Sequence, residues 1–222
     1  DIGFVGANVT AEKQANVQVI RDLGYGKCRL SVAIPKNGSP KTAADLDGKR
    51  IATSYPNLTR KYFTDRGMHV DIVTISGAVE IAPRLGVADA VCDLVSTGGT
   101  LKANGLIETD VIFESECQLI QTNRPLSPEK QDLIDKFLVR IGGCQLASRS
   151  RYIMMNAPKS ALKEITSVIS ALNSPTVLPL EDENMIAIHS VIPIQEFWEV
   201  MERLKSAGAT GIVILPIENM IM

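Results

Sequence analysis

Short apolar segments alternate with amphipathic segments over the first 150 residues, and the two periodicities predict strands and helices in turn. The apolar stretches predict strands at Asp1–Val5, Cys28–Pro35, Arg50–Thr53, His69–Ile75, Asp89–Val95 and Asp110–Gln121. The amphipathic stretches predict helices from Asn8 to about Asp22, from Pro56 to near Gly67, over Ala78–Leu85 and over Thr100–Asn104. Such alternation favours parallel sheets covered by helices.

A longer helix is predicted to begin at Ser127-Pro128-Glu129, because Ser can cap a helix and Pro suits its first turn. Gly142-Gly143 predicts its end. From Arg151 the order becomes strand, helix, two strands joined by an acidic turn, helix and strand. This βαββαβ order is the ferredoxin-like plan. The unit is acidic and lacks the aromatic motif of RNA-binding modules, so a module that senses small molecules or oligomerises fits better.

Composition excludes several classes of function. The 222 residues carry a net charge of −2, which gives no electrostatic reason to expect nucleic acid or an anionic membrane as a partner. No apolar run approaches the ~20 residues of a membrane-spanning helix, and the first residues do not resemble a signal peptide. Four widely spaced cysteines lack zinc-ligand spacing, so we expect reduced thiols in a cytoplasmic protein. Two histidines offer little basis for a histidine triad or a multi-histidine metal site.

The run from Glu80 to Leu101, EIAPRLGVADAVCDLVSTGGTL, carries the candidate chemistry. An apolar strand containing Asp93 passes through Ser96-Thr97-Gly98-Gly99-Thr100 into a helix. Glycines let the backbone approach a ligand, and N–H groups at a helix start favour a phosphate. Asp93 near the carboxyl end of its strand can accept hydrogen bonds from sugar hydroxyls. These features suit a sugar phosphate or a nucleotide, although an ordinary turn rich in Gly and Thr has the same pattern. The run is neither a Walker loop nor a G-x-G-x-x-G fingerprint.

The same run resembles the signature of the ATP phosphoribosyltransferase family, the first enzyme of histidine biosynthesis. The matching positions are Glu80, Gly86, Ala88, Val91, Asp93-Leu94 and Thr97-Gly98-Gly99-Thr100-Leu101. Further similar stretches are DIGFVGANV, GKCRLSVA, GKRIATSYPNL, KANGL and RYIMMNAP. Near the end, SPTVLPL and LKSAGATGIVILPIE resemble the regulatory domain of the family's long form. The resemblance therefore covers essentially the whole chain.

The resemblance implies an α/β fold with a two-lobed, periplasmic-binding-protein-like catalytic region and a C-terminal ferredoxin-like (ACT-like) regulatory domain. By position, the first lobe takes residues 1–26 and 109–150, the second lobe residues 27–108, and the regulatory domain residues 151–222. An opening segment of the first lobe precedes this stretch in the family, so we expect an N-terminally truncated chain with an incomplete first lobe. Whether this chain is active alone stays open.

The family's reaction joins N1 of the ATP adenine to C1 of phosphoribosyl pyrophosphate, with Mg²⁺ present, and releases pyrophosphate. The resemblance implies that Ser96, Thr97, Gly98, Gly99 and Thr100 hold the 5′-phosphate. It also implies that Glu80 and Asp93 bind the ribose hydroxyls and that Tyr55 lies near the nucleotide. No residue is assigned as a catalytic acid or base, and none as a metal ligand.

In the family's long form the third domain binds L-histidine, which inhibits the enzyme. By position, the resemblance implies contacts from Asn156, Thr176 and Gly211. It further implies a cytoplasmic glycosyltransferase that assembles as a dimer or a hexamer. Two other functions stay open: a non-catalytic fragment that binds histidine or a nucleotide, and a two-lobed solute-binding protein.

Overall fold

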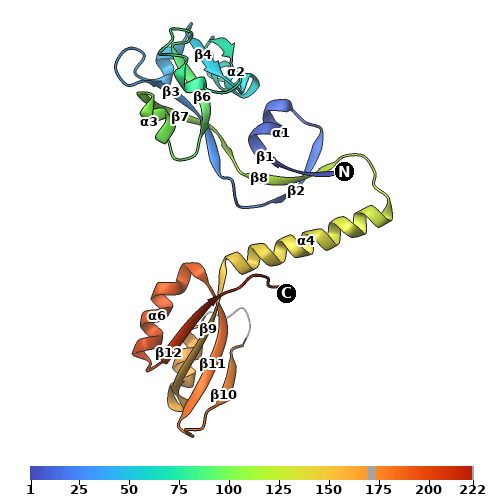
Figure 1. The fold of residues 1–222 in the computed structure, drawn as a ribbon, viewed down its shortest axis with the longest axis vertical. Helices are drawn as coiled ribbons and strands as arrows, with labels where there is room; N and C mark the ends of the chain where they lie inside the picture. Colours follow the sequence, from blue (N-terminus) through green and yellow to red (C-terminus); the bar gives the residue numbers. More distant parts are fainter. Residues whose placement is uncertain (170–173, 222) are drawn as a thin grey trace. The chain divides into compact units, whose positions relative to one another are not determined.

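The computed structural model describes residues 1–169 and 174–221, and it divides the chain into two compact units (Figure 1). The first unit is Asp1–Pro125 and the second is Leu126–Met222. Both combine helices with strands, as the mixed α/β prediction requires. Within the described residues, no helix is long and apolar enough to span a membrane.

A three-stranded antiparallel sheet forms one part of the first unit, in the order β1-β8-β2. Its strands are β1 (Ile2–Gly6), β2 (Val17–Asp22) and β8 (Cys117–Thr122). Helix α1 (Ala7–Lys13) joins β1 to β2. The predicted helix from Asn8 to about Asp22 is therefore wrong in its second half. Gln14 ends the helix in a left-handed conformation with φ of 47°, and the following segment gains backbone hydrogen bonds from β8.

A five-stranded sheet forms the rest of the first unit, in the order β5-β4-β6-β3-β7. Its strands are β3 (Cys28–Pro35), β4 (Arg50–Thr53), β5 (Asp71–Thr74), β6 (Ala90–Val95) and β7 (Leu106–Ser115). The prediction of parallel sheets is confirmed only where β4 pairs with β5 and β6. It is wrong elsewhere, because β3 is inserted between β6 and β7 and runs antiparallel to both.

The single strand predicted over Asp110–Gln121 is two strands. The break is at Glu116, where the chain leaves the five-stranded sheet and enters the three-stranded sheet. The chain makes the opposite passage between β2 and β3 (Figure 1). Two chain crossings therefore join the two sheets.

Apolar side chains pack on both faces of the five-stranded sheet, because successive residues of a strand point to opposite faces. Leu30 and Val32 belong to one core cluster, together with Phe63 of helix α2 (Pro56–Thr64). Ala33 and Val91 belong to the other cluster, which packs against the short elements η2 (Val79–Ile81) and α3 (Gly99–Ala103). A further turn, η1 (Ala43–Leu46), adds Leu46 to the first cluster.

In the second unit, an antiparallel sheet of order β10-β11-β9-β12 packs against two helices. Its elements are β9 (Ser150–Pro158), α5 (Leu162–Val168), β10 (Thr176–Pro179), β11 (Met185–Pro193), α6 (Phe197–Ser206) and β12 (Thr210–Pro216), with short turns η3 (Lys159–Ala161) and η4 (Ile194–Glu196). The predicted βαββαβ order is confirmed. Ile153, Ile165, Ile188 and Leu204 are fully buried in its core.

Helix α4 (Pro128–Ser148) begins as predicted, with the Ser127 hydroxyl accepting a hydrogen bond from the Lys130 N–H at 3.4 Å. Its predicted end at Gly142-Gly143 is wrong. The Gly143 carbonyl accepts the Met220 N–H at 3.2 Å, and a Cβ on Gly143 would lie 3.3 Å from the Met220 oxygen. The glycine therefore gives room for the C-terminal segment. Because α4 falls in the second unit, the division differs from our lobe boundaries, which stay a prediction.

Candidate functional site

The loop after β6 stands at the carboxyl end of a central strand. Val95, the last residue of β6, is buried, whereas Ser96, Thr97, Gly99 and Thr100 are exposed. Gly98 has φ of 78°, in the left-handed region that side chains disfavour, so glycine suits the turn into α3. The first N–H groups of a helix have no partner inside it, so the turn can present donors to an anion.

Asp93 lies two residues before the end of β6 and is half-buried. Its Oδ1 accepts the Leu94 N–H at 2.8 Å. Burial raises the pKa of Asp93, and the negative charge of Glu80 raises it further, whereas the Leu94 N–H opposes the shift. The two predicted carboxylates are thus close enough to interact electrostatically beside the loop.

Glu80 is held by the 3-10 turn η2, not by the helix predicted over Ala78–Leu85. Ala78 precedes the turn with φ of 50°, and Pro83 follows it. Proline lacks the N–H that would continue an α-helix, so the segment stays a short turn. The prediction of a helix here is wrong, although its residue Glu80 still reaches the neighbourhood of Asp93.

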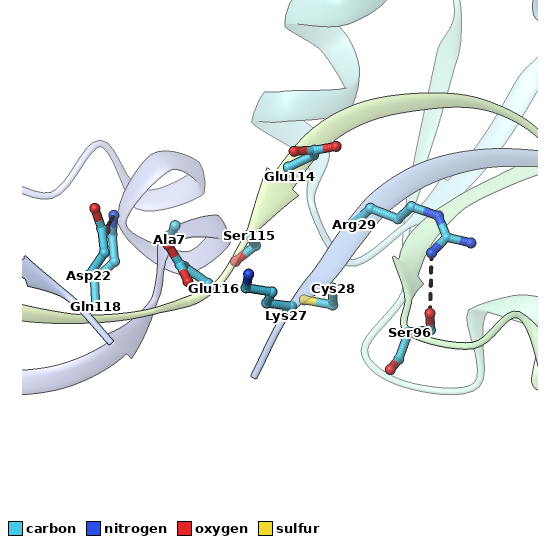
Figure 2. Close-up of a pocket in the computed structure, with 10 residues that line it drawn as sticks. All are labelled: Ala7, Asp22, Lys27, Cys28, Arg29, Ser96, Glu114, Ser115, Glu116 and Gln118. Carbon is cyan, nitrogen blue, oxygen red and sulfur yellow. Dashed lines mark hydrogen bonds between the residues drawn. The ribbon is translucent and has the colours of Figure 1, made fainter. Parts of the chain in front are cut away.

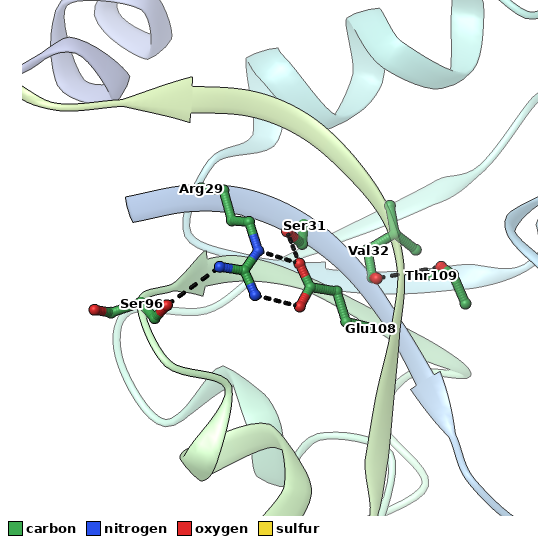
Figure 3. Close-up of polar contacts among 6 residues, drawn as sticks. All are labelled: Arg29, Ser31, Val32, Ser96, Glu108 and Thr109. Carbon is green, nitrogen blue, oxygen red and sulfur yellow. Dashed lines mark hydrogen bonds and ion pairs between the residues drawn. The ribbon is translucent and has the colours of Figure 1, made fainter. Parts of the chain in front are cut away.

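A third acidic side chain connects the loop to the sheet through Arg29 (Figure 3). The Arg29 guanidinium donates to both oxygens of Glu108, at 2.5 Å and 2.6 Å, and to the Ser96 carbonyl at 3.2 Å. The Ser31 hydroxyl also donates to Glu108, at 2.7 Å. Hydrogen bonds from Arg29 lower the pKa of Glu108, and the same pair raises the pKa of Arg29.

The sequence predicts no role for Arg29. Its partners Ser96 and Glu108 are 67 and 79 positions away, so no local pattern joins them. The only signal was its place in the stretch GKCRLSVA, which leaves the partner unknown. The structure brings β3, β6 and β7 side by side, so the guanidinium of Arg29 on β3 contacts Glu108 of β7 and the Ser96 carbonyl that follows β6.

Tyr55 follows β4, the parallel neighbour of β6, so it lies at the same edge of the sheet as Ser96. Its hydroxyl accepts a hydrogen bond from Nδ2 of Asn8 at 3.0 Å. Burial raises the pKa of Tyr55 and the charge of Asp93 adds to the rise, while the Asn8 contact lowers it. The structure therefore brings Tyr55, Asp93 and the loop to one region.

A cavity of about 640 Å³ opens next to the loop (Figure 2). Cavities of this size can hold a small molecule. Residues of both signs of charge line it: Ala7, Asp22, Lys27, Cys28, Arg29, Ser96, Glu114, Ser115, Glu116 and Gln118. Ser96 belongs to the loop and Arg29 donates to its carbonyl, so the cavity and the loop share these two residues.

The three residues expected to bind histidine lie in the second unit. Asn156 of β9 and Gly211 of β12 are neighbours, since a Cβ on Gly211 would be 3.9 Å from the Asn156 Nδ2. Thr176 begins β10 and pairs with His189 of β11, so one strand separates it from β9. At ~4.8 Å per strand and ~3.4 Å per residue, Thr176 is roughly 12 Å from Asn156 within one chain. The structure thus brings two of the three together.

Two family models match the chain. The first, described as "HisG: ATP phosphoribosyltransferase", matches residues 1–143, and the second, "HisG, C-terminal domain", matches residues 147–219. An ATP phosphoribosyltransferase of Cytophaga hutchinsonii is 44% identical over 221 residues, which are 100% of this chain and 77% of that protein. One of Parabacteroides distasonis is 46% identical over 222 residues, which are 100% of this chain and 78% of that protein.

A solved structure is also similar: the ATP phosphoribosyl transferase (HisG:HisZ) complex from Thermotoga maritima. It has a TM-score of 0.54 and 35% sequence identity, and the match covers 62% of this chain and 66% of that chain.

Proposed function

The chain belongs to the ATP phosphoribosyltransferase family, and we propose that it carries out the family's transfer at the loop after β6. The reaction condenses ATP with phosphoribosyl pyrophosphate to N1-(5-phosphoribosyl)-ATP and pyrophosphate, the first step of histidine biosynthesis. The single observation that carries the site is the half-buried carboxyl group of Asp93 at the carboxyl end of β6, directly before the exposed loop Ser96–Thr100.

In this proposal the loop Ser96–Thr100 binds the 5′-phosphate through backbone N–H groups and the hydroxyls of Thr97 and Thr100. Glu80 and Asp93 accept hydrogen bonds from the ribose hydroxyls. Positive charge develops on the ribose as the bond to pyrophosphate breaks, so two carboxylates next to the sugar stabilise the transition state. Holding phosphate and ribose together also fixes C1 in line for attack by N1 of adenine.

Arg29 supports the loop in this proposal and does not bind substrate. Its Nη1 holds the Ser96 carbonyl, while Glu108 and Ser31 fix the other end of the side chain. A loop held in place loses little conformational entropy when it binds a phosphate, so the contact improves affinity. Tyr55 bounds the region where the nucleotide lies.

Mg²⁺ is proposed to arrive with the pyrophosphate group as part of the substrate. In the described part of the chain, no group of three or more His, Cys, Asp and Glu side chains is arranged to hold a metal ion. Mg²⁺ commonly binds through substrate phosphates and one or two carboxylates, and Asp93 and Glu80 offer such oxygens. When bound, the ion neutralises charge on the departing pyrophosphate.

We propose feedback inhibition by L-histidine in the second unit, at Asn156 and Gly211, with Thr176 as a further contact. Inhibition at a distance requires that histidine bind one arrangement of the enzyme better than another. A homo-oligomer, a dimer or a hexamer, fits that requirement. The transferase is proposed to be a glycosyltransferase of the cytoplasm, in keeping with four free cysteines.

The test is release of pyrophosphate from ATP and phosphoribosyl pyrophosphate by a protein extended to the length of its relatives, and by its Asp93→Asn variant. We expect kcat/KM for phosphoribosyl pyrophosphate to fall about 100-fold or more, because a transition-state contact is lost. Asp89→Asn is the matched control: Asp89 precedes β6 and accepts the Arg50 N–H at 2.9 Å, away from the loop. Equal rates for both variants would overturn the site.

Calorimetry with L-histidine separates the enzyme from a non-catalytic binding fragment. Heat of binding without turnover, in a protein extended to the length of its relatives, would favour the fragment. Turnover that L-histidine suppresses, and that Asn156→Ala releases from suppression, would support the enzyme with its regulatory site.

A further inference from the structure

Two buried polar residues of α1 contact the start of α2. Asn8 and Glu12 are four positions apart, so they lie on one face of the helix. Each is only 5% exposed, unlike most residues of their type. Helix α1 follows a strand of the three-stranded sheet, whereas α2 packs on the five-stranded sheet, and the two helices are in contact (Figure 1).

Glu12 caps α2 from 45 or more positions away. The N-cap of α2 is Tyr55, whose side chain makes no cap hydrogen bond, and Pro56 has no N–H to satisfy. The next two N–H groups, of Asn57 and Leu58, donate to Oε1 and Oε2 of Glu12 at 3.0 Å and 2.9 Å. The side-chain amide of Asn57 (Nδ2) also donates to the backbone carbonyl of Glu12 at 3.0 Å. A carboxylate is favoured there by the helix dipole.

Asn8 holds the Tyr55 hydroxyl from the same helix. Its Nδ2 donates to Tyr55 at 3.0 Å, and its Oδ1 accepts the Ser115 hydroxyl at 2.8 Å. The Ser115 oxygen in turn accepts the Asn8 backbone N–H at 3.0 Å. The amide of Asn8 is therefore fixed on both sides.

Gly6 makes the space that the Asn8 amide needs. A Cβ on Gly6 would lie 2.3 Å from the Asn8 Oδ1, well inside contact distance. Gly6 has φ of −69° and ψ of 138°, which any residue adopts, so space rather than backbone conformation favours glycine here. An alanine would push the Asn8 amide out of its place between Ser115 and Tyr55.

We propose that Asn8 and Glu12 are positioning residues for Tyr55: Glu12 fixes the backbone that follows it, and Asn8 fixes its hydroxyl. Neither touches substrate in this proposal. The inference rests on the proposed function in one respect, namely that Tyr55 lies near the bound nucleotide. It adds two residues of α1, which follows the three-stranded sheet, that hold Tyr55 at the edge of the five-stranded sheet.

The electrostatics of Tyr55 agree with the geometry and give a readout without ligand. The Asn8 contact is the main influence that lowers the pKa of Tyr55 against the effect of burial. Moving the amide away therefore raises that pKa. If Asn8 had no influence on Tyr55, moving its amide would leave the Tyr55 titration unchanged.

The first experiment compares Glu12→Gln with the wild-type chain, using ATP as the calorimetric probe. The glutamine amide cannot accept at both positions, so we expect the Asn57 and Leu58 amides to exchange about tenfold faster and ATP to bind about tenfold more weakly. Asp45→Asn is the matched control, since Asp45 also accepts two backbone N–H groups but is exposed and belongs to η1. Faster exchange with unchanged ATP affinity would overturn the inference.

The second experiment needs no ligand and uses Gly6→Ala and Asn8→Ala, with Tyr55→Phe to identify the Tyr55 signal in an ultraviolet titration. Both alanine variants are expected to raise the Tyr55 pKa, and an unchanged titration would overturn the inference. Should the wild-type chain bind no ATP, the proposed function fails at Tyr55, and the titration together with the amide exchange decides the positioning role by itself. Should Glu12→Gln not fold, the amide-exchange and ATP measurements are made with Glu12→Asp, which keeps the charge on a side chain one carbon shorter, and the titration tests the role of Asn8.

Discussion

The interior of the first unit is stabilised differently from the interior of the second unit. In the first unit, the buried polar side chains include Asn8, Glu12 and Ser115, which form hydrogen bonds between segments far apart in sequence. In the second unit, the described buried polar residues are Ser150 and Ser190, and the core is a cluster of apolar side chains. The first unit has the candidate site and the second has the regular βαββαβ fold.

This difference teaches where precision is needed. Apolar burial is strong but non-directional, so it brings elements together without fixing single atoms. Buried hydrogen bonds cost free energy when they are broken, so they fix the relative position of the groups they join. The polar contacts of the first unit converge on the Ser96 loop and on Tyr55, where a transferase needs fixed geometry.

The largest test of this comparison truncates one core side chain in each unit. Ile51 and Ile153 are both fully buried, so Ile51→Ala and Ile153→Ala should each lower the free energy of unfolding of their own unit by about 2–5 kcal/mol. Only Ile51→Ala should also impair transfer. Hydrogen exchange by mass spectrometry, read peptide by peptide in increasing urea, measures the two units separately. Equal loss of protection in both units from either change would contradict the distinction.

The second unit could be predicted closely from its sequence because its signals are local. Each strand and helix carries its own periodicity, and the order alone specified the ferredoxin-like plan. The predicted helix end at Gly142-Gly143 is wrong because Gly143 contacts Met220, which is distant in the sequence. A glycine that gives room for packing has the same local appearance as one that ends a helix.

The first unit could be predicted only in part. The strand, glycine turn and helix around Asp93 and Ser96–Thr100 could be predicted because they follow one another directly, while the binding roles of these residues stay a prediction. The direction of β3, the break at Glu116 and the Arg29–Glu108 contact were not, because each depends on which strands become neighbours. The cap by Glu12 is a similar case, since its partners are 45 and 46 positions away.

A smaller test concerns the support of the loop by Arg29. Arg29→Lys keeps the positive charge but cannot contact both Glu108 oxygens and the Ser96 carbonyl together. We expect KM for phosphoribosyl pyrophosphate to rise about tenfold, with a smaller change in kcat, because binding is weakened more than the chemical step. Steady-state kinetics of pyrophosphate release measures both constants.

The control for this test is Arg50→Lys. Arg50 forms an exposed ion pair with Asp89 at 3.5 Å and has no contact with the loop among those described. Its KM should stay within about twofold of wild type, since exposed pairs contribute little. A similar rise in both variants would mean that general electrostatic attraction, and not loop support, sets the affinity.

The smallest expected effect is on the pH dependence, through the Glu80–Asp93 pair. Asp93 must be ionised to stabilise positive charge, so kcat/KM for phosphoribosyl pyrophosphate should rise as pH passes upward through its pKa. Burial and Glu80 raise that pKa, so the acidic limb lies above the usual aspartate range of about 3.9. Glu80→Gln removes a like charge, so the limb should move toward lower pH even though the rate is reduced. Glu218→Gln, an exposed change in the second unit, should leave the limb where it is.

The same shift fixes the sign of a stability effect in the first unit. A carboxyl group whose pKa is higher in the folded than in the unfolded state stabilises the fold below the unfolded value, and this stability is lost as pH rises through the folded value. Glu80→Gln narrows the pH interval between the pKa of Asp93 in the unfolded state and its pKa in the folded state. At pH values above this interval, the variant should therefore lose less stability to Asp93 ionisation than wild type does. Urea unfolding of the first unit at several pH values, followed by hydrogen exchange, measures the difference. A difference of opposite sign would mean that Glu80 stabilises the fold through contacts other than its interaction with Asp93. If the acidic limb of kcat/KM also stays in place in Glu80→Gln, the two carboxylates do not interact, and Asp93 remains the acidic group proposed to bind the sugar.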